Sequence, residues 1–253
     1  SSDLCYDNYK ETRNYYRMVE KQLYIIMPVK DSIEIAEKAI RAIVNSGHTL
    51  CVYDDYSLPA NARILDEIAA ETNIQVIHIA DLTNHPSPNY RLVLQRSQQE
   101  ALVQDKHLVI VESDVIVGKH TLNKMAEEVK HGVGMVAAVT VDEDGHFNFP
   151  YQYTRKWWYR FYDKNTIITK KRFSFCCTLL SNELLQKVDF LQLDPGKNWY
   201  DVTIAHWSVK LGLENLLMLG NPVLHLPHSS RPWKRLKYTH PLRYYWRKVT
   251  QRL

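Results

Sequence analysis

Residues 22–141 alternate short apolar runs with stretches whose apolar residues recur at helical spacing. The first run, LYIIMPV (23–29), is rich in Ile and Val, and residues 31–47 follow with the period of an amphipathic helix. We expect further strands at 49–55, 74–80, 107–114 and 134–141, separated by helices near 59–72, 90–104 and 119–130. Because strands joined through helices run parallel and carry helices on both faces, this order predicts an α/β fold with a mostly parallel, Rossmann-like sheet.

The predicted helix at 31–47 has recognisable end signals. Asp31 and Glu34 have the spacing of a capping box, and Gly47 is suited to end a helix. We therefore expect the Asp31 side chain to cap this helix.

The alternation fades after about residue 142. Residues 151–172 are aromatic and basic, and we expect a loop or irregular strand there. A short helix at 181–188, a longer one near 200–211 and a final strand with its loop at 221–230 follow. The sequence has no GxGxxG and no GxxxxGK[ST] motif, which disfavours dinucleotide and P-loop binding of the usual kinds.

The net charge of +4 is distributed unevenly along the 253 residues. Residues 231–253 contain eight Lys and Arg residues and no acid, which leaves 24 basic against 28 acidic residues elsewhere, a net charge of −4. A mildly acidic body argues against a nucleic-acid-binding core. The tail interleaves Trp and Tyr with its cations, which suits a membrane interface with anionic lipid, single-stranded nucleic acid, or a helix packed on the body.

The four cysteines lack the spacing of zinc or redox motifs. Cys51 falls in a predicted strand, where we expect a buried thiol, and Cys176 and Cys177 are neighbours that pair poorly as a disulfide. This usage favours a reducing compartment. No apolar run approaches the roughly 20 residues of a membrane-spanning helix, and no signal-peptide pattern opens the chain. We therefore expect a cytoplasmic protein.

Acidic residues fall at the carboxyl ends of two predicted strands. Asp54 and Asp55 end one strand, and Glu112 and Asp114 interrupt the apolar run VIVESDVIV (109–117). If the strand continues through this run, alternation puts the Glu112 and Asp114 side chains on the same side. Ligands of parallel sheets bind at this edge, and two converging carboxylates can share Mg²⁺ or Mn²⁺. The alternative is an acidic turn whose charges reach water.

Three segments, IIMPVKDS, VYDDYS and IVESDVIV, resemble the amino-terminal half of family 2 glycosyltransferases, which have the GT-A fold. In that family, the first strand opens the nucleotide site and an Asp-x-Asp signature binds the metal and the diphosphate. The resemblance implies nucleotide contacts at Pro28, Val29, Asp54, Asp55 and Ser113. It makes Asp114 the principal ligand of a Mn²⁺ or Mg²⁺ ion, while Glu112 replaces the first Asp with a longer side chain.

Residues 89–102 occupy the place of a family stretch that is rich in Gly and Ala and carries an Arg-Asn pair. Arg96 fits the Arg, whereas Ser97 replaces the Asn and Tyr90 replaces a usual Gly. Arg96 is expected either to pair with a diphosphate or to be a solvated helical side chain.

The second half resembles the family more loosely. In NWYDVTIAHWSVKLG (198–212), Asp201 matches an aspartate that acts as the catalytic base, although Tyr200 and Thr203 stand where acids are often found. Asp201 can also be an ordinary helix N-terminal acid. His225 is the first choice for a His that completes the metal site, and His228 is the second.

The aromatic residues of the second half are expected to build the acceptor site, although core packing is the alternative. We place acceptor contacts at Trp157, Trp158, Trp199 and Tyr200. The resemblance divides the chain into an N-terminal extension at 1–21, a nucleotide-sugar-binding half at 22–141, an acceptor-binding and catalytic half at 142–230, and a basic aromatic tail at 231–253.

The resemblance implies an inverting, metal-dependent glycosyltransferase. It would move a sugar from a nucleotide-diphosphate donor, with a UDP-sugar expected first, to a glycan or lipid-linked acceptor. Residues 231–253 would contact the inner face of a membrane, and no nucleic-acid partner is expected. The alternatives are a degenerate adaptor that binds nucleotide or glycan, and a nucleotidyltransferase, whose usual Gly-rich loop is missing.

Overall fold

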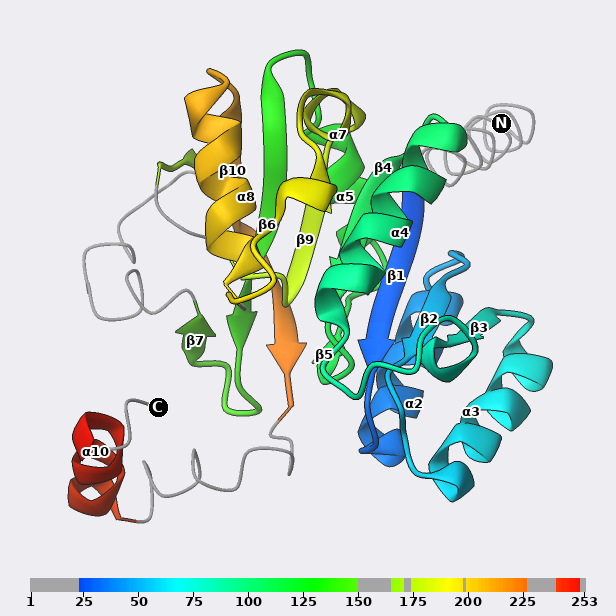
Figure 1. The fold of residues 1–253 in the computed structure, drawn as a ribbon. Helices are drawn as coiled ribbons and strands as arrows, with labels where there is room; N and C mark the ends of the chain where they lie inside the picture. The colour runs from blue at the N-terminus through cyan, green and yellow to red at the C-terminus, as the bar shows by residue number, and fades with distance from the viewer. Residues whose placement is uncertain (1–22, 150–164, 171–173, 198, 227–239, 251–253) are drawn as a thin grey trace, which may run out of the picture.

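The computed structural model describes residues 23–149, 165–170, 174–197, 199–226 and 240–250 (Figure 1). The strands are β1 (Leu23–Val29), β2 (Cys51–Asp54), β3 (Gln75–His78), β4 (His107–Val111), β5 (Val115–Ile116), β6 (Val133–Val141), β7 (Phe147–Phe149), β8 (Thr166–Ile168), β9 (Cys177–Leu180) and β10 (Glu214–His225). The helices are α2 (Ile33–Asn45), α3 (Pro59–Thr72), η1 (Ile79–Asp81), α4 (Tyr90–Val103), α5 (Thr121–Glu127), α7 (Asn182–Lys187), η3 (Phe190–Gln192), α8 (Tyr200–Lys210) and α10 (Pro241–Thr250). The predicted alternation in the first half is therefore confirmed.

One sheet holds the strands in the order β3-β2-β1-β4-β9-β6-β10-β5. The pairs β2–β3, β1–β2 and β1–β4 are parallel, whereas β9 is antiparallel to both β4 and β6. Since β6 and β10 are again parallel to each other, six strands of this path share one direction and only β9 and β5 oppose it. This confirms the predicted mostly parallel α/β sheet, and the antiparallel strands β9 and β5 make it a mixed one.

Helices cover both faces of the sheet, as expected. Apolar side chains of α2, α3 and α5 form one core with one face, and those of α4, α7 and α8 form a second core with the other. In Figure 1, α4, α7 and α8 lie in front of the sheet. Alternation along β1 explains this division, because Ile25 and Met27 enter the first core while Ile26 enters the second.

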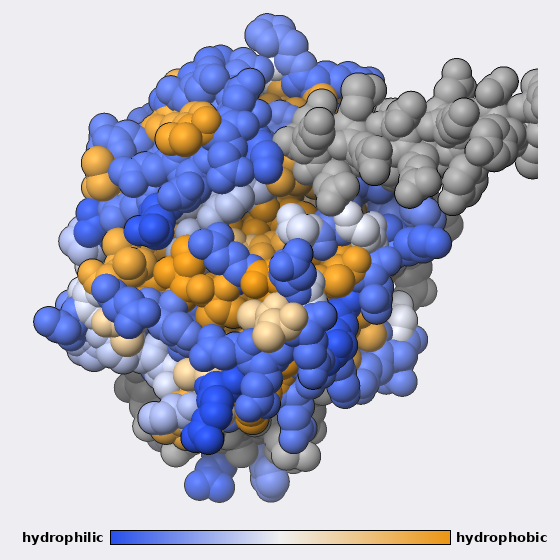
Figure 2. Space-filling model, turned by 90° about the vertical axis from the view of Figure 1, so that its right-hand side faces the viewer, coloured by the Kyte–Doolittle hydropathy of each residue, from blue (hydrophilic) through white to orange (hydrophobic). Residues whose placement is uncertain are grey.

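The outer edge of the sheet brings apolar side chains to the surface. Figure 2 shows an apolar band across the face on which β2, β3, α3 and α4 lie, surrounded by hydrophilic residues. Val76 and Ile77 of β3, the terminal strand, are partly buried against the two cores. The strand is therefore only partly covered by the described residues.

The predicted capping box at Asp31 and Glu34 is wrong. Helix α2 begins at Ile33, and Ser32, with a φ of 53°, precedes it without any side-chain cap. Asp31 instead accepts hydrogen bonds at Oδ1 from the Leu58 backbone N–H, at 2.9 Å, and from a side chain in the first turn of α3. The carboxylate therefore ties the turn after β1 to the start of α3, because it bonds the residue that precedes this helix and a side chain of its first turn.

The prediction of one strand through 107–114 also needs correction. Strand β4 ends at Val111, and the Val115 backbone N–H donates to the Glu112 carbonyl at 3.1 Å in the turn that follows. The run VIVESDVIV thus contains two strands, of which β5 pairs antiparallel with β10 at the other end of the strand order. The Glu112 and Asp114 carboxylates are accordingly aimed by a turn, and strand alternation does not apply to them.

The final strand is longer than predicted. Strand β10 begins at Glu214, and its pairing with β6 shifts in register between Met218 and Val223. A proline in a strand is tolerated at such an irregularity, which accounts for Pro222. Of the predicted irregular segment 151–172, only residues 165–170 lie within the described part of the chain.

Candidate functional site

Asp54 ends β2 and Asp55 follows it at the carboxyl edge of the sheet, the lower edge of the sheet in Figure 1. Asp54 is buried, and its Oδ2 lies 2.8 Å from Nδ1 of His78. The two residues are close because Asp54 of β2 pairs with His78 of β3 in the sheet. Burial lowers the pKa of His78, but hydrogen bonds to Asp54 and Asp66 outweigh it and leave this pKa raised. Asp54 is thus held in a fixed position by its neighbouring strand.

Asp55 fastens the loop that enters α4. Its carboxylate accepts from the Asn89 backbone N–H at 2.9 Å, from the Asn89 side-chain amide at 2.8 Å and from the Ser87 hydroxyl at 2.8 Å. These bonds position the start of α4, where Tyr90 lies. The nucleoside contact expected for Asp54 and Asp55 stays a prediction, as do those expected for Pro28 and Val29 at the end of β1.

Glu112, Asp114 and His225 meet at the same edge. His225 ends β10, pairs with Val115 in the sheet and places its Nε2 3.2 Å from Asp114 Oδ2. One ligand atom each from Glu112, His225 and Cys176 lies within 4.8 Å of the other two. Asp114 is 6% exposed, so this group of acids is partly shielded from water. The structure thus brings the predicted ligands Glu112 and His225 together, and Asp114 adjoins them through its contact with His225. Ser113 lies in the turn between the two acids.

Cys176 is a member of this site that sequence reasoning missed. Its thiol lies 3.3 Å from Glu112 Oε2, and its carbonyl accepts from the Glu112 backbone N–H at 2.9 Å. Burial first, and the charge of Glu112 second, raise the pKa of the Cys176 thiol well above its usual value. No local signal marks this contact, because 64 residues separate the two side chains.

The described cysteines otherwise agree with expectation. Cys51, Cys176 and Cys177 are buried and form no disulfide with one another. The Cys177 thiol points to the Met125 sulfur of α5 at 3.7 Å, inside the core.

Tyr90 connects the metal-ligand candidates with Asp201. Its ring stacks in a tilted arrangement with Tyr200, with centroids 6.4 Å apart. Burial raises the pKa of Tyr90 well above its usual value, and the charges of Glu112 and Asp201 raise it further. The Tyr90 hydroxyl is buried without a hydrogen-bond partner among the described residues. A buried hydroxyl of this kind fits a site that receives a polar ligand.

Asp201 and its neighbours begin α8 at the same edge of the sheet (Figure 1). Asp201 is partly exposed in the first turn, Trp199 is 65% exposed, and Tyr200 is buried at 6%. Trp199 therefore presents its ring to solvent, whereas Tyr200 packs in the core. The acceptor contacts expected of both remain predictions, and Trp157, Trp158 and His228 lie outside the described residues.

Arg96 lies near the middle of α4. It follows Tyr90 by six residues on α4, which corresponds to about 9 Å along the helix axis. Its charge acts on Cys51 and Tyr53 of β2, and its Nε is buried without a hydrogen-bond partner in the described part of the chain. Pairing of Arg96 with a diphosphate stays a prediction.

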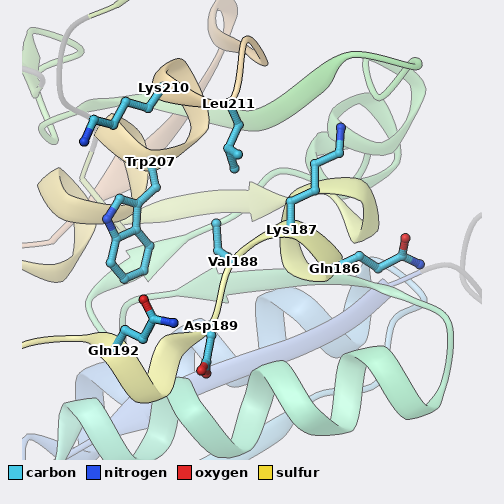
Figure 3. A pocket seen from close by; sticks show the side chains of 8 residues that line it. All are labelled: Gln186, Lys187, Val188, Asp189, Gln192, Trp207, Lys210 and Leu211. Atoms are coloured by element: carbon cyan, nitrogen blue, oxygen red, sulfur yellow. The ribbon is translucent and has the colours of Figure 1, made fainter.

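Two further features involve other residues. Asp142, Asp144 and His146 form a group of possible ligands, but Asp142 Oδ1 accepts backbone N–H bonds from the other two, as in an ordinary polar turn. A cavity of about 360 Å³ lies near the ends of α7 and α8 (Figure 3). It is lined by Gln186, Lys187, Val188, Asp189, Gln192, Trp207, Lys210 and Leu211. None of these belongs to the predicted site.

A sheet of this kind with acids at its carboxyl edge is the architecture of GT-A glycosyltransferases. The sequence profile of glycosyl transferase family 2 matches residues 24–188, and the chain belongs to this family of glycosyltransferases. The predicted family, fold and enzyme class are thereby confirmed. No curated protein sequence matches the chain significantly.

Solved structures show the same fold at low sequence identity. Residues 1–349 of S. aureus TarS share 14% identity with a TM-score of 0.56, over 81% of this chain and 60% of that one. GalNAc-T7 with UDP, GalNAc and Mn²⁺ shares 12% identity with a TM-score of 0.57, over 83% of this chain and 44% of that one. Glucosyl-3-phosphoglycerate synthase from Mycobacterium tuberculosis with Mn²⁺ and UDP-glucose shares 13% identity with a TM-score of 0.53, over 88% of this chain and 78% of that one. The chain thus spans less than two thirds of the length of the first two structures.

Proposed function

We propose that this glycosyltransferase moves a sugar from a nucleotide-diphosphate donor, with a UDP-sugar as the first candidate, to a hydroxyl of a glycan or lipid-linked acceptor. The observation that carries the proposal is the meeting of Glu112, Asp114 and His225 at the carboxyl edge of the sheet. The donor class is supported by two structures of similar fold, which contain UDP or UDP-glucose together with Mn²⁺.

The residues at this edge fit a divalent cation. Carboxylate and imidazole groups are common ligands of such ions, and Asp114, Glu112 and His225 present them from a turn and from the end of β10. A cation bound there supplies Lewis-acid stabilisation of the negative charge on the departing diphosphate.

Asp201 is the proposed general base. Its carboxylate takes the proton of the acceptor hydroxyl while the oxygen forms a bond to the anomeric carbon, and the bond from that carbon to the diphosphate breaks on the opposite side. This displacement inverts the anomeric configuration. The start of α8 favours the ionised form of Asp201, since the helix dipole is positive there.

The substitution Asp201→Asn tests this role. The amide cannot accept the proton, so we expect transfer to fall by about 10²–10⁴-fold while donor affinity is kept. Turnover is measured with a panel of nucleotide sugars in Mn²⁺, and donor affinity by thermal shift. Asp81→Asn, at an exposed position in η1, is the matched control. Full turnover in the Asp201→Asn variant would refute the base assignment.

The same assay separates the two rival functions. An adaptor that has lost catalysis would bind the donor and leave it intact, in keeping with the departures from the family pattern at Tyr200 and Thr203. A nucleotidyltransferase would instead release pyrophosphate when given a nucleoside triphosphate and a sugar phosphate. Release of nucleoside diphosphate from a nucleotide sugar supports the proposed transfer alone.

A further inference from the structure

The edge that holds the acids also holds a sulfur atom. The Cys176 thiol donates toward Glu112 Oε2 at a distance of 3.3 Å, and the ligand atoms of Cys176, Glu112 and His225 all lie within 4.8 Å of one another. Two ligands of one tetrahedral zinc ion, a sulfur at about 2.3 Å and an oxygen or nitrogen at about 2.0 Å, stand about 3.6 Å apart. Only small side-chain adjustments would therefore place these three atoms around one ion.

The backbone fixes the sulfur in this place. Cys176 directly precedes β9, whose first residue, Cys177, pairs with Val111 at the end of β4. The backbone hydrogen bond from Glu112 to Cys176 extends this pairing by one residue. Because the contact follows from sheet register, it does not depend on a chance rotamer of an exposed side chain. Cys176 itself is only 6% exposed.

The chemistry of a thiol distinguishes this site from one built of oxygen and imidazole alone. Thiolate, imidazole and carboxylate together are the ligands of Zn²⁺ and Co²⁺, whereas Mg²⁺ is bound almost entirely by oxygen. The Cys176 sulfur lies 3.3 Å from Glu112 Oε2 and 2.9 Å from the Ser174 hydroxyl oxygen. When such an ion binds, it replaces the thiol proton, which leaves to solvent.

We propose that Cys176 is a thiolate ligand of the same divalent cation as Glu112 and His225, and that the site therefore prefers Zn²⁺ or Co²⁺ to Mg²⁺. This inference rests on the proposed function for the existence of the cation site. It adds a ligand that the family pattern does not assign, and it changes the expected metal.

The chain provides a matched control for this proposal. Cys177 is adjacent in sequence and also buried, but its thiol contacts the Met125 sulfur in the core. Cys177→Ser therefore makes the same chemical change one residue away and leaves the cation site unaltered. Circular dichroism and thermal unfolding of Cys176→Ser and Cys177→Ser test whether both variants fold.

The decisive readout is the near-ultraviolet charge-transfer absorption that sulfur bonded to Co²⁺ produces. With stoichiometric Co²⁺, we expect the band in the wild-type protein and in Cys177→Ser, and its loss in Cys176→Ser. Competition dialysis should show the preference for Zn²⁺ over Mn²⁺ falling by tenfold or more in Cys176→Ser. The wild-type measurement alone is informative if that variant does not fold, because absence of the band with Co²⁺ bound overturns the proposal.

The outcomes separate this inference from the proposed function. Sugar transfer with bound Co²⁺ but no sulfur band, or with the band unchanged in Cys176→Ser, refutes the Cys176 ligand and leaves the transferase intact. If the sulfur band depends on Cys176 but no sugar transfer is detected, Cys176 is supported as a cation ligand and the proposed glycosyl transfer is refuted. Failure of Co²⁺ and Zn²⁺ to bind overturns the ligand proposal.

Discussion

At the scale of single residues, Glu112 stands where the Asp-x-Asp signature of the family has its first Asp, and its side chain has a partner of its own. The Glu112 carboxylate leaves the turn after β4 and reaches the Cys176 thiol. Asp114, from the same turn, contacts His225. His225 therefore lies near both acids, and Cys176 is an additional partner of Glu112.

Asp114→Asn is expected to remove the cation-dependent part of donor binding. An amide keeps the shape of the side chain but carries no charge for a cation, so the thermal shift produced by UDP with Mn²⁺ or Zn²⁺ should fall to that produced by UDP alone. Asp81→Asn should bind as the wild type does. Undiminished metal-dependent binding in Asp114→Asn would sink the role given to Asp114.

Tyr90→Phe tests whether the buried Tyr90 hydroxyl serves a ligand. Because this hydroxyl has no hydrogen-bond partner among the described residues, its removal should leave the free energy of unfolding unchanged or slightly raised. Substrate contact would appear as a rise of about five- to tenfold in KM for donor or acceptor, from the loss of one hydrogen bond. Denaturant unfolding and steady-state kinetics measure the two effects. A large loss of stability with normal kinetics would show that the hydroxyl acts only in the fold.

At the scale of elements, the loops after β1 and β2 hold the helices by side-chain hydrogen bonds. Asp31 joins the end of β1 to the start of α3, and Asp55 joins the end of β2 to the start of α4. Both carboxylates thus satisfy backbone groups of helices that lie far along the chain.

Asp31→Ala should destabilise the protein by about 1 kcal/mol, the usual net contribution of a hydrogen bond, because it removes the bonds to Leu58 and Asn61. The pKa of Asp31 is lowered, first by the backbone hydrogen bond from Leu58, so this contribution is present above the unfolded-state pKa and is lost as the pH falls through the folded-state value. Glu34→Ala is the matched control, since Glu34 is exposed in the first turn of α2. Urea unfolding measures the free energy of unfolding of both variants. An equal loss of stability in Glu34→Ala would contradict this role of Asp31 and support the capping box predicted at Asp31 and Glu34.

At the scale of the whole molecule, the candidate site draws on both halves of the chain. Glu112 comes from the first half, whereas Cys176, Asp201 and His225 come from the second, and β9 lies between β4 and β6 in the one sheet. None of the described helices is long and apolar enough to cross a membrane. The described side chains of α10 include Leu242 and Trp246, which are 87% and 72% exposed and one helical turn apart.

This helix is the proposed membrane contact of the tail. Leu242 and Trp246 lie on one side of α10 and would enter the interface, while the cations of residues 231–253 attract anionic lipid. We expect co-sedimentation with vesicles containing phosphatidylserine and little with neutral vesicles. Replacing both residues by Ala should lower the partition coefficient by tenfold or more. Equal binding to neutral vesicles, or no effect of the double substitution, would contradict this contact.

The sequence by itself determined the alternation of strands and helices in the first half and the family of the chain. Those properties depend on local periodicity and on short motifs around Asp54 and Asp114, which are present before any folding occurs. Tertiary structure decided that Asp31 bonds to the residue before α3, that the VIVESDVIV run divides between two strands, and that Cys176 meets Glu112. These contacts follow from sheet register and turn geometry between distant segments, and such pairing leaves no periodic trace in the sequence.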